Sequence, residues 1–348
     1  MSKSHIIYEN SATQEKLEVT GPLRSLVNVE ELRQDIGLPD YIDLHDFQIR
    51  KIVVALWAFR YPSALIPGAT KEPLKVALFG GGAFKLYCPS ANRGPFSRKI
   101  GDVDFVTSKA SGALVLKILC GLSEKFGGLF FHATSASDRR FNTLRARKRY
   151  RVHTIKDIDE NGLPIPGLMD IFCDKLPFCH TLDVRDELRE TENHNFTIGL
   201  ENMIISKAQL IKRVPKDKSA NVDQNRTLGE HGKNYFLIGM ETKDMRDVAA
   251  ALLDHELGEG KDRINIEIMG RKLRQDWGLW KTVTKNLRNM QNRLEAITEV
   301  FDAEKKQQEI IGDRLEKIVE QLEGKYAVRK GPLAFSQQWW EEVEEQAT

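Results

Sequence analysis

The sequence predicts an α+β fold in which a mixed sheet with flanking helices is followed by a mainly helical C-terminal region. Two short apolar runs, residues 76–79 and 168–172, are typical of buried strands. Residues 47–61 instead carry apolar side chains at helical spacing. From residue 200 onwards helical spacing predominates. Strands and helices therefore alternate in the first part of the chain, and helices dominate the second.

Composition indicates a protein of the reducing cytoplasm. The 348 residues, 41% of them hydrophobic, are enough for two ordinary cores. The net charge of +2 hides a split: residues 139–151 hold seven Lys/Arg and no acid, whereas residues 295–348 hold 13 acids and 7 bases. The four cysteines form no CxxC pair, and no stretch resembles a signal peptide or a membrane span. We expect a cytoplasmic location and no membrane contact.

The predicted parts follow in order along the chain. Residues 1–44 form an N-terminal arm, and Asp46 is placed to cap the helix of residues 47–61. A loop leads to the strand of residues 76–79, and a short helix is expected from Ala83. The remaining elements of this first domain, residues 45–195, are a helix at 113–119, strands at 128–134, 150–155 and 168–172, and a turn at 157–166.

A glycine triplet follows the first predicted strand. Gly80, Gly81 and Gly82 let the backbone turn tightly and bring its amides close to a ligand. Phosphate is the ligand that such amides typically bind. Taken alone, three glycines more often form only a tight turn. The triplet therefore predicts a phosphate site only in combination with other residues.

Three aspartates supply that combination. Asp102 and Asp104 are two residues apart in a strand-like run, so both carboxylates point to one face, which suits a divalent metal. Acidic pairs at strand ends are otherwise usually solvated. Asp170 is a lone acid inside an apolar strand, which is costly unless it is paired or metal-bound.

The helical region, residues 196–330, contributes further candidates. Lys207 lies on the apolar stripe of a predicted helix at 200–211, either as a ligand-facing cation without a compensating charge or as a snorkelling surface lysine. Residues 216–233 read as a surface loop. Asp244, one turn from Asp247 in a helix at 241–257, is either a site residue or an acid favoured by the helix dipole. A long helix with an apolar seam ends near Gly324, before a polar acidic tail at 331–348.

Together these motifs resemble the nucleotidyltransferase superfamily, whose fold is polymerase-beta-like. Within it the chain looks most like the AbiEii-type nucleotidyltransferases, toxin components of abortive-infection and toxin–antitoxin systems. The matching stretches are residues 78–87 (LFGGGAFKLY), 98–105 (RKIGDVDF), 200–207 (LENMIISK) and 242–247 (TKDMRD). The resemblance covers roughly residues 45–257. One departure is Ala83 after Gly82, where the family usually has a Ser or Thr that contacts phosphate.

The resemblance implies Mg²⁺-dependent transfer of a nucleoside monophosphate from an NTP to an acceptor hydroxyl. Asp102, Asp104 and Asp170 would hold two Mg²⁺ ions, and Asp170 would also help to deprotonate the acceptor. Asp244 would orient Lys207 or act as a base. The residues expected to bind nucleotide are Gly80, Gly81, Gly82, Lys85, Arg98 and Lys207.

The expected acceptor is RNA, because residues 139–151 form a dense basic run beside the predicted sheet. Arg145, Arg147 and Arg149 are its candidate phosphate contacts. Two alternatives stay open. One is a non-catalytic nucleotide- or RNA-binding module of the same fold, whose C-terminal helices dock a partner such as a protein antitoxin. The other is transfer to a protein or a small molecule.

Overall fold

The computed structural model describes residues 5–9, 16–20, 28–66, 68–125, 140, 148–161, 164–190, 196–217, 227–231, 234–329 and 339–341. The chain forms two compact units, and each is built from separate stretches. The first comprises Met1–Leu86, Lys99–Lys175 and Asp183–Ile198. The second comprises Tyr87–Arg98, Leu176–Leu182 and Gly199–Thr348. The two short stretches of the second unit interrupt the first in sequence.

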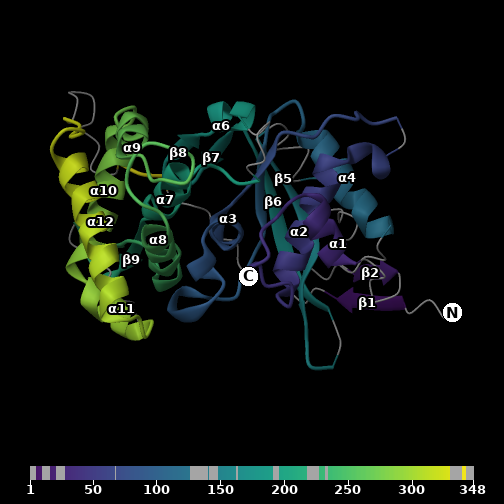
Figure 1. Ribbon diagram of the computed structural model, residues 1–348, viewed down its shortest axis with the longest axis horizontal. Helices are drawn as coiled ribbons and strands as arrows, with labels where there is room; N and C mark the ends of the chain where they lie inside the picture. Colours follow the sequence, from purple (N-terminus) through teal and green to yellow (C-terminus); the bar gives the residue numbers. More distant parts are fainter. Residues whose placement is uncertain are drawn as a thin grey trace. The chain divides into compact units, whose positions relative to one another are not determined.

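The first unit contains a four-stranded mixed sheet (Figure 1). Its strands are β3 (Val76–Phe79), β4 (Asp104–Thr107), β6 (Pro164–Cys173) and β5 (Arg149–Ile158), in the order β3-β4-β6-β5. β4 pairs antiparallel with β3 and parallel with β6, and β5 pairs antiparallel with β6. Helices and a mixed sheet together confirm the predicted α+β class.

Two helices pack against this sheet. Helix α2 (Phe47–Arg60) contacts β5, and α4 (Gly112–Lys125) contacts β5 and β6 (Figure 1). The predicted cap of α2 is confirmed, because the Asp46 carboxylate accepts hydrogen bonds from the N–H groups of Gln48 and Ile49. The other elements of this unit are β1 (His5–Glu9), β2 (Lys16–Thr20), α1 (Val29–Asp35) and α6 (Arg185–Glu190).

The helix after the glycine triplet begins earlier than predicted. We expected it to start at Ala83, but α3 spans Gly80–Tyr87. Gly80 has a φ of 68°, a left-handed value that glycine adopts without a Cβ penalty. The chain therefore passes from strand β3 into helix α3 through a single residue, and the other two glycines lie within the first helical turn.

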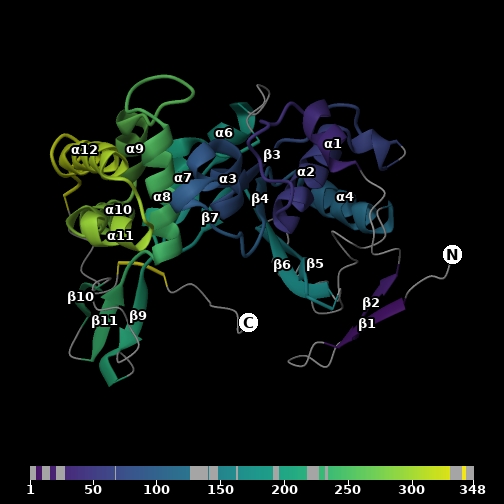
Figure 2. The ribbon, with the colours of Figure 1, turned by 60° about the horizontal axis from the view of Figure 1, so that its bottom comes forward.

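The second unit is mainly helical, as predicted. Its helices are α7 (Leu200–Ala208), α8 (Thr242–Asp254), α9 (Ile266–Leu273), α10 (Trp277–Asn292), α11 (Leu294–Val300) and α12 (Lys305–Glu323). The single long helix expected at the end is two helices, because the chain turns at residues 301–304, where Asp302 has a φ of 54°. The predicted apolar seam of α12 is buried, and α12 packs against α8 and α10 (Figure 2).

The expectation of a surface loop at residues 216–233 is wrong for its last part. β10 (Thr227–His231) joins β11 (Tyr235–Ile238) and β9 (Lys212–Pro215) in an antiparallel sheet of order β10-β11-β9 (Figure 2). The sequence of β10, TLGEH, has little strand character of its own. Its conformation comes from pairing with β11, which local pattern does not show. A short pair, β7 (Lys175–Pro177) and β8 (Thr181–Asp183), completes the strands.

Some predictions fall outside the described residues. These are the strand at residues 128–134, most of the acidic tail at 331–348, and the candidate RNA contacts Arg145 and Arg147. Among the helices that the structure describes, none combines the length and apolar character needed to cross a membrane.

Candidate functional site

The turn at Gly80 faces the Asp104 carboxylate. Phe79 and Asp104 are paired residues of the antiparallel strands β3 and β4. A Cβ atom placed on Gly80 would lie 4.0 Å from Oδ2 of Asp104. The structure therefore brings the predicted glycine turn and the predicted metal ligand together, although they are 24 residues apart in sequence.

Gly82 has a different reason to be glycine. A Cβ atom there would come within 2.8 Å of Cδ1 of Ile52 and 3.2 Å of Cδ2 of Leu78. Helix α3 thus packs closely against α2 at this point, and only glycine fits without a shift. Lys85, another predicted nucleotide-binding residue, is buried in the same helix, with 4% of its surface exposed.

Asp104 and Asp170 are neighbours on one face of the sheet, and Asp102 lies two residues before the first residue of β4. Val103 and Phe105 are buried on the opposite face, whereas Asp102 is exposed and Asp104 is half-buried, as strand alternation predicts. Phe105 pairs with Ile171 in the parallel strands β4 and β6, so Asp104 lies beside Asp170. The backbone N–H of Asp170 donates a hydrogen bond to Oδ1 of Asp104 over 3.3 Å.

The charges in this cluster disfavour a third ionised carboxylate. Burial, and then the negative charges of Asp102 and Asp170, raise the pKa of Asp104 well above its usual range. The N–H of Asp170 and the Arg149 guanidinium act in the opposite direction. A divalent cation held by Asp102 and Asp104 would stabilise the ionised form, so this donor set fits such a cation. In the part of the chain that is described, no three His, Cys, Asp or Glu side chains form a ready-made metal cluster.

Asp170 is paired with two arginines, which explains how an acid is tolerated inside this strand. Arg149 forms an ion pair with Oδ2 of Asp170, and Nε of Arg151 lies 3.2 Å from Oδ1. The sequence reasoning treated Arg149 as an RNA contact and did not connect it with Asp170. A predicted pairing of the strand at 150–155 with the strand at 168–172 would have suggested the contact between Arg149 and Asp170.

Lys51 was not among the predicted site residues. It lies on α2 and is 1% exposed, and its Nζ donates hydrogen bonds to Oγ1 of Thr154 over 2.5 Å and to the carbonyl of Ile155 over 2.7 Å. Burial lowers the pKa of Lys51 to about 7, against the opposing effect of Asp102 and two other aspartates. The sequence signal for this group was a lysine followed directly by eight apolar residues, 52–59, in the same helix.

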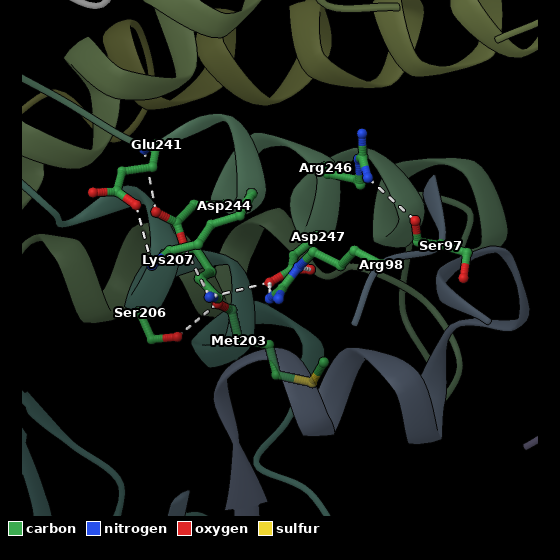
Figure 3. A network of polar contacts seen from close by, with 10 residues as sticks. Ser97, Arg98, Met203, Ser206, Lys207, Glu241, Asp244, Arg246 and Asp247 are labelled. Carbon is green, nitrogen blue, oxygen red and sulfur yellow. Dashed lines mark hydrogen bonds and ion pairs between the residues drawn. The ribbon is translucent and has the colours of Figure 1, made fainter. Parts of the chain in front are cut away.

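The second unit holds a separate polar network around Lys207 (Figure 3). Lys207 Nζ lies 2.9 Å from Oδ1 of Asp244 and 3.1 Å from Oδ2 of Asp247. The Arg98 guanidinium donates two hydrogen bonds to the Asp247 carboxylate, from Nε over 2.8 Å and from a terminal nitrogen over 2.6 Å. Two cations and two carboxylates balance one another, so the expectation that Lys207 lacks a compensating charge is wrong.

The pKa values follow from this mutual pairing. Burial disfavours the charged form of Lys207, but the Asp244 and Asp247 carboxylates outweigh it and raise the pKa of Lys207 above its ordinary value. Burial likewise opposes ionisation of Asp247, but Lys207 and Arg98 outweigh it and lower its pKa. Lys207 and Asp247 therefore each favour the charged form of the other.

Asp244 has a structural role as well. Its Oδ2 accepts a hydrogen bond from the N–H of Glu241 over 3.2 Å, and the two residues form a capping box at the start of α8. The same carboxylate contacts Lys207 through its other oxygen. Both interpretations of Asp244 offered by the sequence, an acid in the first turn of a helix and orientation of Lys207, agree with its position and contacts, and the capping box is a further role.

The described residues define an α+β protein with an acidic cluster on the sheet of one unit and a balanced ion network among the helices of the other. No family model, no curated protein and no solved structure matches this chain.

Proposed function

We propose that this protein is a nucleotidyltransferase of polymerase-beta-like fold that depends on a divalent metal and moves a nucleoside monophosphate from an NTP to a hydroxyl of RNA. The observation that carries the proposal is the meeting of Gly80, Asp104 and Asp170 at neighbouring strands. A strand, a glycine turn into a helix, an antiparallel strand that begins at the second of two paired acids, and a strand parallel to it with a third acid occur along the chain in the order that the resemblance implies.

The residues divide the work in the following way. Asp102 and Asp104 would hold the metal, and the bound ion would stabilise charge on the attacking and leaving oxygens. The amides of the first turn of α3, from Gly80 to Gly82, offer donors to the phosphate chain. Asp170 supports the charge balance through Asp104, and its own oxygens are held by arginines.

Two of the residues that the resemblance assigns to nucleotide binding lie in the second unit. Lys207 and Arg98 are the predicted nucleotide contacts, and both are held by carboxylates in this structure. To contact phosphate, Lys207 or Arg98 would therefore have to give up part of its ion pairing with Asp244 or Asp247. The toxin-type role, the partner antitoxin and the cytoplasmic location are proposed on the resemblance and composition alone.

A second candidate function is a nucleotide- or RNA-binding module without catalysis. The observation in its favour is the pairing of Asp170 with Arg149 and Arg151, which occupies both carboxylate oxygens of the third acid. Such a protein would bind nucleotide or RNA and release neither pyrophosphate nor modified RNA.

Incubation with each labelled NTP, Mg²⁺ and total RNA separates these functions. The enzyme should incorporate label into RNA, and Asp104→Asn should lower the rate by at least about 100-fold, because a lost metal ligand removes several kcal/mol of charge stabilisation. The matched control is Asp40→Asn, an exposed aspartate of the same unit. Full activity of a correctly folded Asp104→Asn protein would refute the metal assignment. Binding without incorporation would favour the module, and label in protein or in a small molecule would change the acceptor.

A further inference from the structure

Arg149 and Arg151 lie on the same face of the sheet as the aspartates. They are two residues apart on β5, where Arg151 pairs with Asp170 and Arg149 pairs with Phe172 of β6. Arg151 therefore meets Asp170 directly across the strands, and Arg149 reaches it diagonally. Two arginine side chains of strand β5 therefore lie beside the carboxylate cluster.

The two arginines differ in their surroundings. The Arg151 side chain is 13% exposed and contacts Asp170 through Nε. The Arg149 side chain is 30% exposed, and its guanidinium lies over the Phe172 ring, 4.8 Å from the centroid. This ring attracts the guanidinium independently of Asp170, so Arg149 keeps one favourable contact when it leaves the carboxylate. Its partial exposure also lets a solvent-borne anion reach it. Arg149 is thus the more easily exchanged of the two partners.

Charge counting shows what would displace Arg149. With all three aspartates ionised, they and the two arginines give the cluster a formal charge of −1, and protonation of Asp104, which its raised pKa favours, makes the cluster neutral. A divalent cation makes it positive, and the cation then competes with Arg149 for the oxygens of Asp170. A polyphosphate anion beside the cation offers Arg149 a new partner of higher charge.

We propose that Arg149 is an exchangeable partner of Asp170: it pairs with Asp170 when no substrate is bound, and it transfers to the phosphate chain of a nucleotide when a divalent cation takes its place. Arg151 stays with Asp170 throughout. This inference rests on the proposed function and adds that the metal and the phosphate chain bind cooperatively through one side chain. Arg149 accordingly has opposite effects on the two ligands.

Binding measurements on the full chain test this exchange without any catalytic assay. Mn²⁺ affinity is measured alone, and the affinity for inorganic tripolyphosphate is measured with excess Mn²⁺. Arg149→Gln should bind Mn²⁺ alone about 10-fold more tightly and manganese tripolyphosphate about 10-fold more weakly, the scale of one charge-assisted hydrogen bond. Arg149→Lys, which keeps the charge, should restore part of the anion affinity. The matched control Lys148→Gln removes an exposed neighbouring cation and should change either affinity by less than about 2-fold.

The outcomes separate the inference from the proposed function. Equal Mn²⁺ affinity of the parent protein and Arg149→Gln overturns the exchange and leaves the nucleotidyltransferase proposal intact. Absence of binding by both proteins at millimolar Mn²⁺ overturns both. Binding by Arg149→Gln but not by the parent supports the exchange. A lowered melting temperature of Arg149→Gln, with no gain in Mn²⁺ affinity, identifies Arg149 as a structural partner only.

Discussion

Replacement of Lys51 by methionine should change how stability depends on pH. Lys51 is fully buried, and its Nζ donates hydrogen bonds to a hydroxyl, Thr154 Oγ1, and to a carbonyl, Ile155 O. Methionine has a similar length and no charge. Thr154 keeps a hydrogen bond to the Ile155 carbonyl over 3.0 Å in the absence of the lysine. The variant therefore removes a titrating group and leaves little else unsatisfied.

The sign and size follow from the difference between the two pKa values of Lys51. The value is about 7 in the folded protein, below the ordinary 10.5. Between these values the unfolded chain binds more protons, so the lysine's contribution to stability rises with pH and is lost as pH falls towards 7. The slope approaches about 1.4 kcal/mol per pH unit, which amounts to about 3 kcal/mol between about pH 7.5 and pH 10.

Urea unfolding at several pH values measures this contribution. The free energy of unfolding of the parent protein minus that of Lys51→Met should rise by about 3 kcal/mol across this range. Groups shared by both proteins, including the buried cysteines, cancel in the difference. Lys156→Met, an exposed lysine of β5, is the control and should give a difference that is independent of pH. A flat difference curve for Lys51→Met would show that Lys51 stays protonated in the folded protein, contrary to this reasoning.

Three further substitutions test contacts within one unit or the other. Lys207→Met should destabilise the protein by about 3–5 kcal/mol, because two buried carboxylates lose a partner, and urea unfolding should show it. Arg314→Met should cost about 1–3 kcal/mol in the same assay, since Arg314 donates to three carbonyls at the end of α8, whereas the exposed neighbour Lys317→Met should cost little. Gly82→Ala should be destabilising by about 1 kcal/mol. Ile52→Val, which removes Cδ1, should relieve that cost in a double-mutant cycle.

Contrary results would be informative for each of these. An unchanged unfolding midpoint for Lys207→Met would mean that the carboxylates find other partners or become protonated. A matching cost for Lys317→Met would show that α12 is sensitive in general rather than at Arg314. Strict additivity of Gly82→Ala and Ile52→Val would remove the close contact as the reason for glycine at this position.

Local patterns in the sequence were sufficient where the structure depends on near neighbours. The strand at 76–79 was predicted to the residue, and the helix at 47–61 was one residue too long. The Asp46 cap depends on contacts within a few residues, and the apolar spacing along α12 was enough to predict which of its side chains are buried. The burial of Val103 and Phe105, in contrast to the more exposed Asp102 and Asp104, also follows the predicted alternation, although β4 begins only at Asp104.

Contacts between distant residues explain what the patterns missed. Arg149 and Asp170 are 21 residues apart, and Lys207 and Asp244 are 37 apart, so no local pattern connects the charges. The sequence therefore presented Asp170 and Lys207 as lone groups with a functional reason to be there. In the structure both Asp170 and Lys207 have ion-pair partners. If either residue binds a metal ion or a nucleotide, it must exchange those partners for the ligand.

The order in which the chain is synthesised bears on the bond between Arg98 and Asp247. These residues are 149 positions apart, and Arg98 belongs to a stretch that precedes most of the sheet of the first unit. At a ribosomal rate of about 5–20 residues per second, about 7–30 s pass between the two. The sheet strands β4, β5 and β6 are synthesised during this interval, whereas α8 is completed only after it. A nascent chain must therefore keep the Tyr87–Arg98 stretch accessible while the first unit forms, and a fragment that begins at Gly199 would contain Asp247 without its arginine.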